Sequence, residues 1–575
     1  MATAEEGKAA EQAAEQAGEA LEPEGGLADL DPIAFGSAFA SAWLRLGLTP
    51  WAALEPMRRF ALGAIDAGAA AGARALGEER PGPVEPPRKD RRFGDPAWQQ
   101  NPFYFGLLQG YLLWQRLVDE LVEAADGDDP AQTDKARFAA GMLTDALAPS
   151  NFLATNPAAL KKAFETGGLS LARGFANFAG DLATNGGLPR QVDDSAFELG
   201  RDLAATPGKV VLRNELMELI QYAPQTETVF DTPLLLSPPW INKYYIMDLA
   251  PGRSFAEWAV KHGHTVFAIS YRNPDESMRD VGLDDYLLHG PGVALDTIQE
   301  ITGADRVNVV GLCLGGTLTA MLLAYLDKQD DDRVRSATLL NTLLDFSEPG
   351  VLGNFVDPAT IERLERKMAK RGFLESTQMS RTFDFLRAND LIWSYVASNW
   401  LMGETPPAFD LLAWNADGTR MPAKMHSFYL RTCYLRNELA RGKLELAGER
   451  LGLAEITEDV YLVGAQEDHI APWRASYRAT QQLGGAVRFV LTSAGHIAGI
   501  VNPPSPKSRR WTNGKLPASS DEWLAGATEH AGSWWEDWAE WIAERAGDRR
   551  KPPRLGSKRH RPLEDAPGTY VRQRY

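Results

Sequence analysis

Six short runs of aliphatic and β-branched residues, each followed by a stretch with helical periodicity, constrain the fold of this chain most. They begin after about residue 210 and cover 232–236, 265–270, 307–310, 336–340, 460–463 and 487–491. Strands that alternate with helices form a parallel sheet whose two faces are both covered. The second half of the chain therefore predicts an α/β fold built on such a sheet.

One long segment within this half departs from the alternation. Between about 344 and 438 the sequence is helical and rich in aromatic residues. The economical interpretation is a cap inserted over the carboxyl edge of the sheet. Residues 207–575 would then form a single α/β domain that carries the cap as an insertion.

The N-terminal part of the chain follows a different pattern. At 575 residues the chain is too long for one ordinary core, so we expect two or three domains. Residues 1–30 contain too few large apolar side chains to offset the entropy lost on folding, so we expect them to be disordered. They begin an N-terminal arm, 1–92, that also contains a short helical region. After a proline-rich break, the periodic and aromatic segment 93–206 predicts an α-helical N-terminal domain.

Charge, hydropathy and cysteine content exclude several classes of protein. A formal net charge of −17 argues against general nucleic-acid binding, because phosphate contacts need clustered Lys and Arg. The two cysteines exclude a disulfide framework and a multi-cysteine metal site, and a free thiol fits a reducing compartment. No apolar stretch could cross a bilayer, and the acidic first residues lack a signal core. We therefore expect a cytoplasmic protein without a transmembrane segment.

The third apolar run ends in a cysteine flanked by glycines, Gly311-Leu-Cys313-Leu-Gly315-Gly316. This matches the nucleophile elbow G-x-S-x-G of α/β hydrolases with a thiol in place of the serine hydroxyl. Cys313 would lie on the sharp strand-to-helix turn, exposed at the carboxyl edge of the sheet, and the backbone N–H of Leu314 would be one oxyanion donor. The alternative is a small buried cysteine between glycines.

A catalytic thiol needs a base, and the base needs an acceptor that orients it. His496 lies in a glycine-flanked loop directly after 487–491, and Asp468 follows 460–463. The chain order of nucleophile, acid and histidine is that of the hydrolase fold. His469 remains a competing base, although we favour His496 because the side chain next to Asp468 should point elsewhere.

The second oxyanion donor of this fold comes from the loop after an early strand. Here that loop is Leu236-Ser-Pro-Pro-Trp-Ile241-Asn-Lys243, and the amide of Ile241 is the candidate because the two prolines have no N–H. Exchange between a cysteine thiolate and an acyl-thioester is nearly isoenergetic and keeps the acyl group activated. The cysteine thus indicates acyl transfer, and nothing in the sequence supports metal catalysis.

Beyond the elbow, motifs from about Phe93 to the C-terminus resemble those of the poly(3-hydroxyalkanoate) synthases. The matching strings are Phe93-Gly-Asp-Pro-Ala-Trp98 with Asn101-Pro102, Pro238-Pro-Trp-Ile-Asn-Lys-Tyr-Tyr245, Ser270-Tyr-Arg-Asn-Pro274, Gly311-Leu-Cys-Leu-Gly-Gly316, Leu343-Leu-Asp-Phe346, Glu467-Asp-His-Ile470, Gly495-His-Ile-Ala-Gly499 and Gly532-Ser-Trp-Trp535. The resemblance implies an α/β-hydrolase fold with an inserted cap, preceded by the mostly α-helical N-terminal domain.

This resemblance also implies roles for the candidate residues. Cys313 would carry the growing polyester, His496 would deprotonate, and Asp468 would position or help activate the incoming hydroxyl. Coenzyme A, part of the substrate, would leave as product, so no separate cofactor is expected. The single-subunit length and the elbow sequence are most similar to the class I type enzymes that prefer 3-hydroxybutyryl-CoA.

The same resemblance implies partners. The helical N-terminal domain would support attachment to the polyester granule and dimer formation, and the cap would be mobile and join two copies in a homodimer. Arg387 would contact the phosphates of coenzyme A, with a surface ion pair as the alternative. The tail after Ala543 should lie on the surface, and the tryptophans before it should pack the last helix onto the sheet.

Three hypotheses therefore follow from the sequence. The favoured one is an acyltransferase that polymerises 3-hydroxyacyl-CoA. The second is a cysteine thioesterase or hydrolase of the same fold. The third, from a different class, is a protein without catalytic activity that coats polyester granules through its tryptophans, and a broken triad would favour it.

Overall fold

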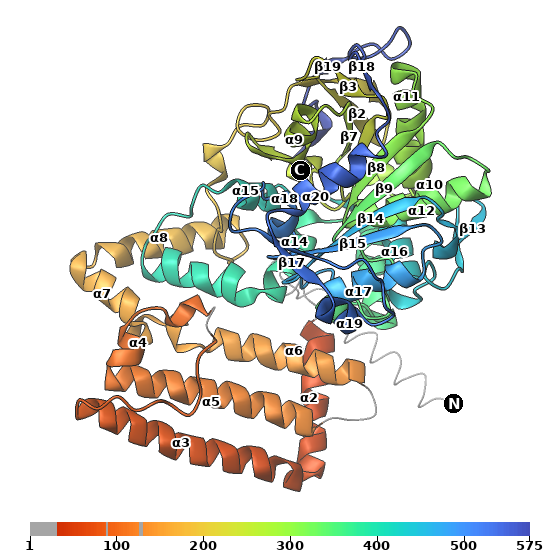
Figure 1. The fold of residues 1–575 in the computed structure, drawn as a ribbon. Helices are drawn as coiled ribbons and strands as arrows, with labels where there is room; N and C mark the ends of the chain where they lie inside the picture. Colours follow the sequence, from red (N-terminus) through yellow and green to blue (C-terminus); the bar gives the residue numbers. More distant parts are fainter. Residues whose placement is uncertain (1–31, 88–89, 126–129, 575) are drawn as a thin grey trace. The chain divides into compact units, whose positions relative to one another are not determined.

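The computed structural model describes residues 32–87, 90–125 and 130–574 (Figure 1). These residues divide into two compact units. The helical unit comprises the chain up to Asp193 together with Arg381–Pro407, and the sheet unit comprises Asp194–Ser380 and Ala408–Tyr575. The predicted disorder of residues 1–30 lies outside the described residues.

The helical unit is built around two pairs of packed helices. Helix α3 lies along α5, where a Cβ on Gly63 would come within 2.5 Å of the Leu113 side chain, and α2 packs on α6. Asn101 caps α5, whose first residue is Pro102, by accepting the N–H of Phe103 at 3.0 Å. The helices are α2 (Pro32–Leu48), α3 (Leu54–Ala75), α4 (Ala97–Gln100), α5 (Pro102–Ala124), α6 (Pro130–Ala146), α7 (Pro157–Glu165) and α8 (Leu169–Thr184).

A segment from the predicted cap completes the helical unit. Two π-helical stretches, Asn389–Trp393 and Val396–Leu401, belong to it, and the second packs on α8 so closely that a Cβ on Gly174 would lie 1.9 Å from the Trp400 carbonyl oxygen. The indole of Trp400 donates to Asp181 at 2.8 Å. The division of the structure into units therefore falls at other positions than the expected boundaries at 92, 206 and 344–438, because α2 and α3 pack on α6 and α5, and residues 381–407 pack on α8.

The sheet unit holds an eleven-stranded sheet whose parallel centre consists of the six predicted strands. In spatial order these are β15 (Val487–Thr492), β14 (Asp459–Ala465), β9 (Val334–Leu340), β8 (Val307–Leu312), β4 (Leu234–Ser237) and β7 (Val266–Tyr271). Antiparallel strands that the sequence analysis missed extend both edges, β16 (Arg509–Thr512) and β17 (Thr528–Ala531) beyond β15, and β2 (Met217–Tyr222), β1 (Gly208–Arg213) and β19 (Glu564–Asp565) beyond β7.

Helices lie between the strands and in the cap. Those of the sheet are α9 (Phe255–Lys261), α10 (Leu283–Leu287), α11 (Val293–Thr302), α12 (Leu314–Lys328), α17 (Trp473–Arg478), α18 (Ala498–Val501), α19 (Ser520–Ala525) and α20 (Trp534–Ala543). Those of the cap are α13 (Pro358–Arg371), α14 (Ser376–Leu386), α15 (Asp410–Ala416) and α16 (Ala423–Tyr429). Short two-stranded ribbons are β3 (Val229–Phe230) with β18 (Arg549–Arg550), β5 (Asp248–Ala250) with β6 (Arg253–Ser254), β10 (Phe373–Leu374) with β11 (Met421–Pro422), and β12 (Leu444–Leu446) with β13 (Glu449–Leu451).

The two ends of the cap insertion are joined to each other. The Asn437 side chain donates to Asp345 at 2.8 Å and accepts the N–H of Phe346 at 2.9 Å. All three residues are buried. The chain therefore leaves the sheet and returns to it at one fixed point.

The tryptophans near the end of the chain pack helix α20 into the sheet unit, as interpreted from the sequence. Trp534, Trp535 and Trp538 are fully buried. The indole of Trp538 donates to the Thr338 hydroxyl on β9 at 2.8 Å, and that of Trp535 donates to the Ile500 carbonyl at 2.8 Å. Each indole N–H of this pair is thus satisfied inside the core.

The last residues lie mostly at the surface, as expected, but they are also fixed to the sheet unit by specific bonds. Residues 564–574, which we call the C-terminal strap, begin as strand β19 at the sheet edge. The buried carboxylate of Glu218 accepts the N–H groups of Thr569 at 3.1 Å and Tyr570 at 3.0 Å, and the Lys243 ammonium donates to the carbonyl of Gln573 at 2.7 Å. The strap is part of the fold because it satisfies buried charges. Within the described ranges, every helix is too short or too polar to cross a bilayer.

Candidate active site

The elbow is formed where strand β8 passes into helix α12. Cys313 lies between them with φ +52° and ψ −118°, a backbone conformation with positive φ that residues with a side chain rarely adopt. Its N–H donates to the Leu340 carbonyl on the neighbouring strand β9 at 2.8 Å, and the residue is partly exposed. Strain of this kind persists where the surroundings fix the backbone, and it is concentrated at functional sites.

The three glycines around Cys313 are required by close packing. A Cβ on Gly311 would lie 2.5 Å from the Gly316 Cα, and one on Gly315 would lie 2.1 Å from the Ser237 carbonyl oxygen. A Cβ on Gly316 would lie 2.0 Å from the Thr342 hydroxyl. The elbow is therefore wedged between the loops that follow β4 and β9.

Asp468 and His496 meet at the same edge of the sheet. They follow the paired parallel strands β14 and β15, and His496 Nδ1 lies 2.7 Å from Asp468 Oδ2. The other carboxylate oxygen of Asp468 accepts the N–H groups of Ile470 and Ala471, each at 2.8 Å. The side chain of Asp468 is 0% exposed and that of His496 is 5% exposed. Of the two histidines weighed from the sequence, His496 is the one that holds this bond to Asp468.

The electrostatics of His496 couple it to both other residues. Burial opposes its positive charge, yet the charges and hydrogen bonds of Asp468 and Cys313 hold its pKa well above the usual range. With Nδ1 turned to Asp468, Nε2 is the ring nitrogen left to face the thiol. The structure thus brings Cys313, His496 and Asp468 together in the arrangement of a nucleophile, a base and an orienting acid.

The two predicted oxyanion amides come from adjacent elements. Leu314 is the first residue of α12, so its N–H has no partner in the ladder of that helix. Ile241 lies in the loop after β4, the strand that pairs with β8. Hydrogen bonds from the Thr419 hydroxyl to the Trp240 carbonyl, 3.2 Å, and from the Trp414 indole to the Lys243 carbonyl, 2.8 Å, hold this loop on both sides of Ile241. The role of the two amides stays a prediction.

Two tyrosines from the end of the cap insertion, Tyr429 and Tyr434, lie near the thiol within an aromatic cluster. The Tyr429 ring packs edge-on against Trp240 at 5.7 Å, Tyr434 at 5.6 Å and Phe346 at 6.1 Å. Burial and then the nearby Cys313 raise the pKa of the Tyr434 hydroxyl, and burial chiefly raises that of Tyr429. The sequence predicted an aromatic-rich cap at 344–438 and gave no sign that these two tyrosines belong to the site.

Arg387 belongs to the helical unit and not to the residues assembled around Cys313. It is exposed and forms an ion pair with Asp390, three residues further along the chain. This is the surface ion pair that the sequence analysis weighed as the alternative. A contact to phosphate groups therefore stays a prediction.

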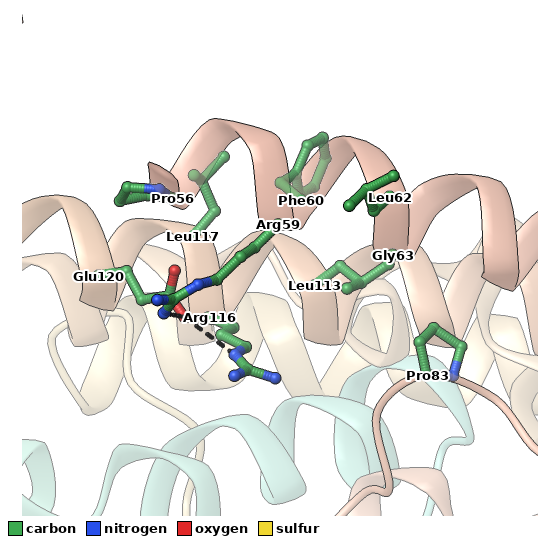
Figure 2. Close-up of a pocket in the computed structure, with 10 residues that line it drawn as sticks. All are labelled: Pro56, Arg59, Phe60, Leu62, Gly63, Pro83, Leu113, Arg116, Leu117 and Glu120. Carbon is green, nitrogen blue, oxygen red and sulfur yellow. Dashed lines mark hydrogen bonds and ion pairs between the residues drawn. The ribbon is translucent and has the colours of Figure 1, made fainter. Parts of the chain in front are cut away.

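A separate hollow lies on the helical unit between α3 and α5 (Figure 2). Its volume is about 210 Å³, and Glu120 on its rim binds both Arg59 and Arg116. The ten residues that line it include no cysteine, serine or histidine: Pro56, Arg59, Phe60, Leu62, Gly63, Pro83, Leu113, Arg116, Leu117 and Glu120. None of the residues predicted for the active site lines this hollow.

The strand order and the strained elbow define an α/β-hydrolase-fold protein, as predicted, and a family model described as "alpha/beta hydrolase fold" matches residues 242–503. A second model, described as the "Poly-beta-hydroxybutyrate polymerase (PhaC) N-terminus", matches residues 89–259. The more particular assignment comes from curated relatives.

The chain is 47% identical to a poly(3-hydroxyalkanoate) polymerase of Methylorubrum extorquens over 85% of this chain and 82% of that protein. It is 45% identical to the poly(3-hydroxyalkanoate) polymerase subunit PhaC of Cupriavidus necator, over 84% and 83% of the two chains. It is 46% identical to poly(3-hydroxyalkanoate) polymerase 2 of Ectopseudomonas oleovorans, over 85% and 87%. The chain belongs to the poly(3-hydroxyalkanoate) polymerase family and is an acyltransferase, which confirms the resemblance found in the sequence.

Proposed function

We propose that this enzyme polymerises (R)-3-hydroxyacyl-CoA, with 3-hydroxybutyryl-CoA as the preferred monomer, into polyhydroxyalkanoate through a thioester on Cys313. The observation that carries the proposal is the strained cysteine at the elbow, coupled to a buried histidine that Asp468 orients at 2.7 Å. A thiol so placed is a nucleophile with its base already in position.

In the first half of the cycle the enzyme is acylated. His496 accepts the proton of the Cys313 thiol, and the thiolate attacks the thioester carbonyl of the substrate. The amides of Leu314 and Ile241 stabilise the oxyanion that forms. Collapse of this intermediate breaks the bond to coenzyme A, whose thiolate takes the proton from His496 as it leaves.

The second half lengthens the chain. His496, held by Asp468, accepts the proton of the hydroxyl group of a second hydroxyacyl-CoA, and that oxygen attacks the thioester on Cys313. An ester bond forms, the Cys313 sulfur leaves and recovers the proton, and the longer chain is carried on coenzyme A. His496 then deprotonates the Cys313 thiol again, the thiolate attacks that new thioester and takes the chain back, and coenzyme A leaves with the proton from His496. The two steps that transfer the acyl group between coenzyme A and Cys313 exchange thiols of similar pKa, so the growing end stays an activated thioester. The elongation step converts the thioester on Cys313 into an oxygen ester.

The aromatic side chains beside Cys313 support transfer to a hydroxyl over transfer to water. Trp240, Phe346 and Tyr429 are nearly fully buried. Exclusion of water from such a site prevents hydrolysis of a reactive intermediate. The proposal extends to a cytoplasmic homodimer at the granule surface that needs no separate cofactor, with Arg387 at the phosphates of coenzyme A.

The test is product analysis with purified full-length protein and (R)-3-hydroxybutyryl-CoA. We expect release of free coenzyme A and formation of polyester, and neither with Cys313→Ala. Cys433→Ala is the matched control, because it removes the other cysteine, which is buried away from solvent. Free 3-hydroxybutyrate as the main product would replace the polymerase with the thioesterase alternative, and no release of thiol at all would favour the granule-coating protein.

A further inference from the structure

Asn341 directly follows strand β9 and has no assigned role. It is fully buried, and its φ of +44° lies in the left-handed region. Asparagine tolerates this region better than most residues with a side chain, yet it remains uncommon there. Glycine would adopt the same backbone without strain. The backbone alone therefore gives no reason for a side chain at this position.

The contacts of Asn341 reach the loops of all three residues of the proposed triad. Its backbone N–H donates to the Val463 carbonyl at 2.8 Å, on the strand that leads to Asp468. Its side-chain Nδ2 donates to the backbone carbonyl of His496. The residue before it, Leu340, accepts the N–H of Cys313 at 2.8 Å.

The remaining oxygen of the Asn341 side chain is unusual. Oδ1 is buried and accepts no hydrogen bond from the described residues. Buried polar atoms are nearly always paired, and an unpaired one opposes folding. A left-handed backbone and an orphaned oxygen are both unfavourable, so the bond from Nδ2 to His496 is what the side chain contributes.

We infer that Asn341 is a positioning residue: its amide fixes the backbone of His496 and thereby sets where the imidazole meets the Cys313 thiol. The bond to Asp468 holds the ring, whereas the bond from Asn341 holds the main chain to which the ring is attached. The loop also contains Ala494 with φ +75°, so several of its backbone angles depend on outside contacts. This inference rests on the proposed role of His496 as the base.

The first variant is Asn341→Gly, which keeps the backbone conformation and removes the amide. We expect kcat to fall about 10- to 100-fold with KM changed less than about twofold, because a small displacement of a base is costly to turnover. Asn341→Asp keeps the size of the side chain and loses the donor, so its kcat should fall at least as far. Asp330→Gly is the control, since Asp330 also has a left-handed φ, +53°, but is exposed at the end of α12.

A second readout separates positioning from folding. The rate at which iodoacetamide alkylates Cys313 is measured against pH, with Tm recorded for each variant. The signal reports one thiol, because burial raises the pKa of Cys433 to about 12. We expect the reactivity of Cys313 near neutral pH to fall in both Asn341 variants toward that of an ordinary thiol, with Tm close to that of the parent.

Unchanged kcat and an unchanged alkylation profile in both variants would overturn the inference. So would a loss of kcat that comes with a lowered Tm and an unaltered alkylation profile, which is the sign of a purely structural residue. The proposed function fails separately, if Cys313→Ala still makes polyester. The two failures can thus be told apart within one set of proteins.

Discussion

Gly316 packs against Thr342, and this contact explains why position 316 of the elbow must be a glycine. The explanation can be tested by asking whether a second substitution, at Thr342, restores the activity lost in Gly316→Ala. In Gly316→Ala the new Cβ would lie 2.0 Å from the Thr342 hydroxyl oxygen, 2.9 Å from its Cγ2 and 3.0 Å from its Cβ. Ordinary contacts of this kind are about 3.5 Å, so the elbow or the loop after β9 must move by more than about 1 Å. A displacement of that size next to a nucleophile costs roughly 100-fold in turnover.

The assay is the initial rate of coenzyme A release at saturating (R)-3-hydroxybutyryl-CoA, with circular dichroism as the check on folding. We expect Gly316→Ala to lose about 100-fold, and addition of Thr342→Ala to restore the rate to within about tenfold of the parent, because it removes the two closest atoms. Thr342→Ala alone loses its hydrogen bond to Leu340 and one buried methyl group, and it should stay near the parent rate.

Gly315→Ala is the matched contrast. Its Cβ would meet the backbone oxygens of Ser237 and Pro238 at 2.1 and 2.5 Å, which no side-chain change can remove. We therefore expect a loss that Thr342→Ala does not repair. A fully active Gly316→Ala protein, or a double variant no better than the single one, would refute the steric account.

Three further predictions concern charge and the C-terminal strap. Burial raises the pKa of the Asp248 carboxyl to about 6, so the folded protein binds this proton more tightly than the unfolded chain does. The free energy of unfolding should therefore fall by about 3 kcal/mol as pH rises from about 4 to about 6. Urea denaturation of Asp248→Asn should show a flatter pH profile, and a profile identical to that of the parent would contradict this. Burial lowers the pKa of Lys243 to about 8, so the contribution of this group to stability rises between about pH 8 and pH 10.5, and Lys243→Met should lose that rise in the same measurement. Truncation after Val571 removes Gln573, whose carbonyl accepts a hydrogen bond from Lys243. The loop that holds Ile241 should then be less firmly held, and the rate of coenzyme A release should fall about tenfold. Arg559→Ala is the control, because it breaks only an exposed ion pair.

Local patterns predicted the centre of the sheet and the residues at its carboxyl edge. The six parallel strands are short runs rich in aliphatic and β-branched residues, and Cys313, Asp468 and His496 each follow one of them. Strand β2 was missed because it carries the buried, charged Glu218, whose partners Thr569 and Tyr570 are distant in sequence. The alternation of apolar and polar residues in a strand indicates which side chains are buried. It does not indicate that a buried carboxylate will find its hydrogen-bond donors in residues near the C-terminus.

The supporting residues of the site were missed for a similar reason. Asn341 after a strand is typical of a turn, and its bond to His496 joins residues far apart in the sequence. Tyr429 and Tyr434 lie in the segment predicted to be an aromatic-rich cap, but helical periodicity does not say which core a helix face will contact. The same limit applies to residues 381–407, whose helical pattern fits either unit.

The shared core of α8 and Trp400 has a consequence for the order in which this protein is made. On the ribosome, α8 is synthesised long before Trp400, the residue whose carbonyl oxygen fills the space beside Gly174. Domains generally fold as units while the chain emerges, from the N-terminal end. Here the first unit must wait for residues 381–407 while the first strands of the other unit are already outside. Chimeras between family members should accordingly exchange 381–407 together with the N-terminal region, since neither piece is a complete folding unit without the other.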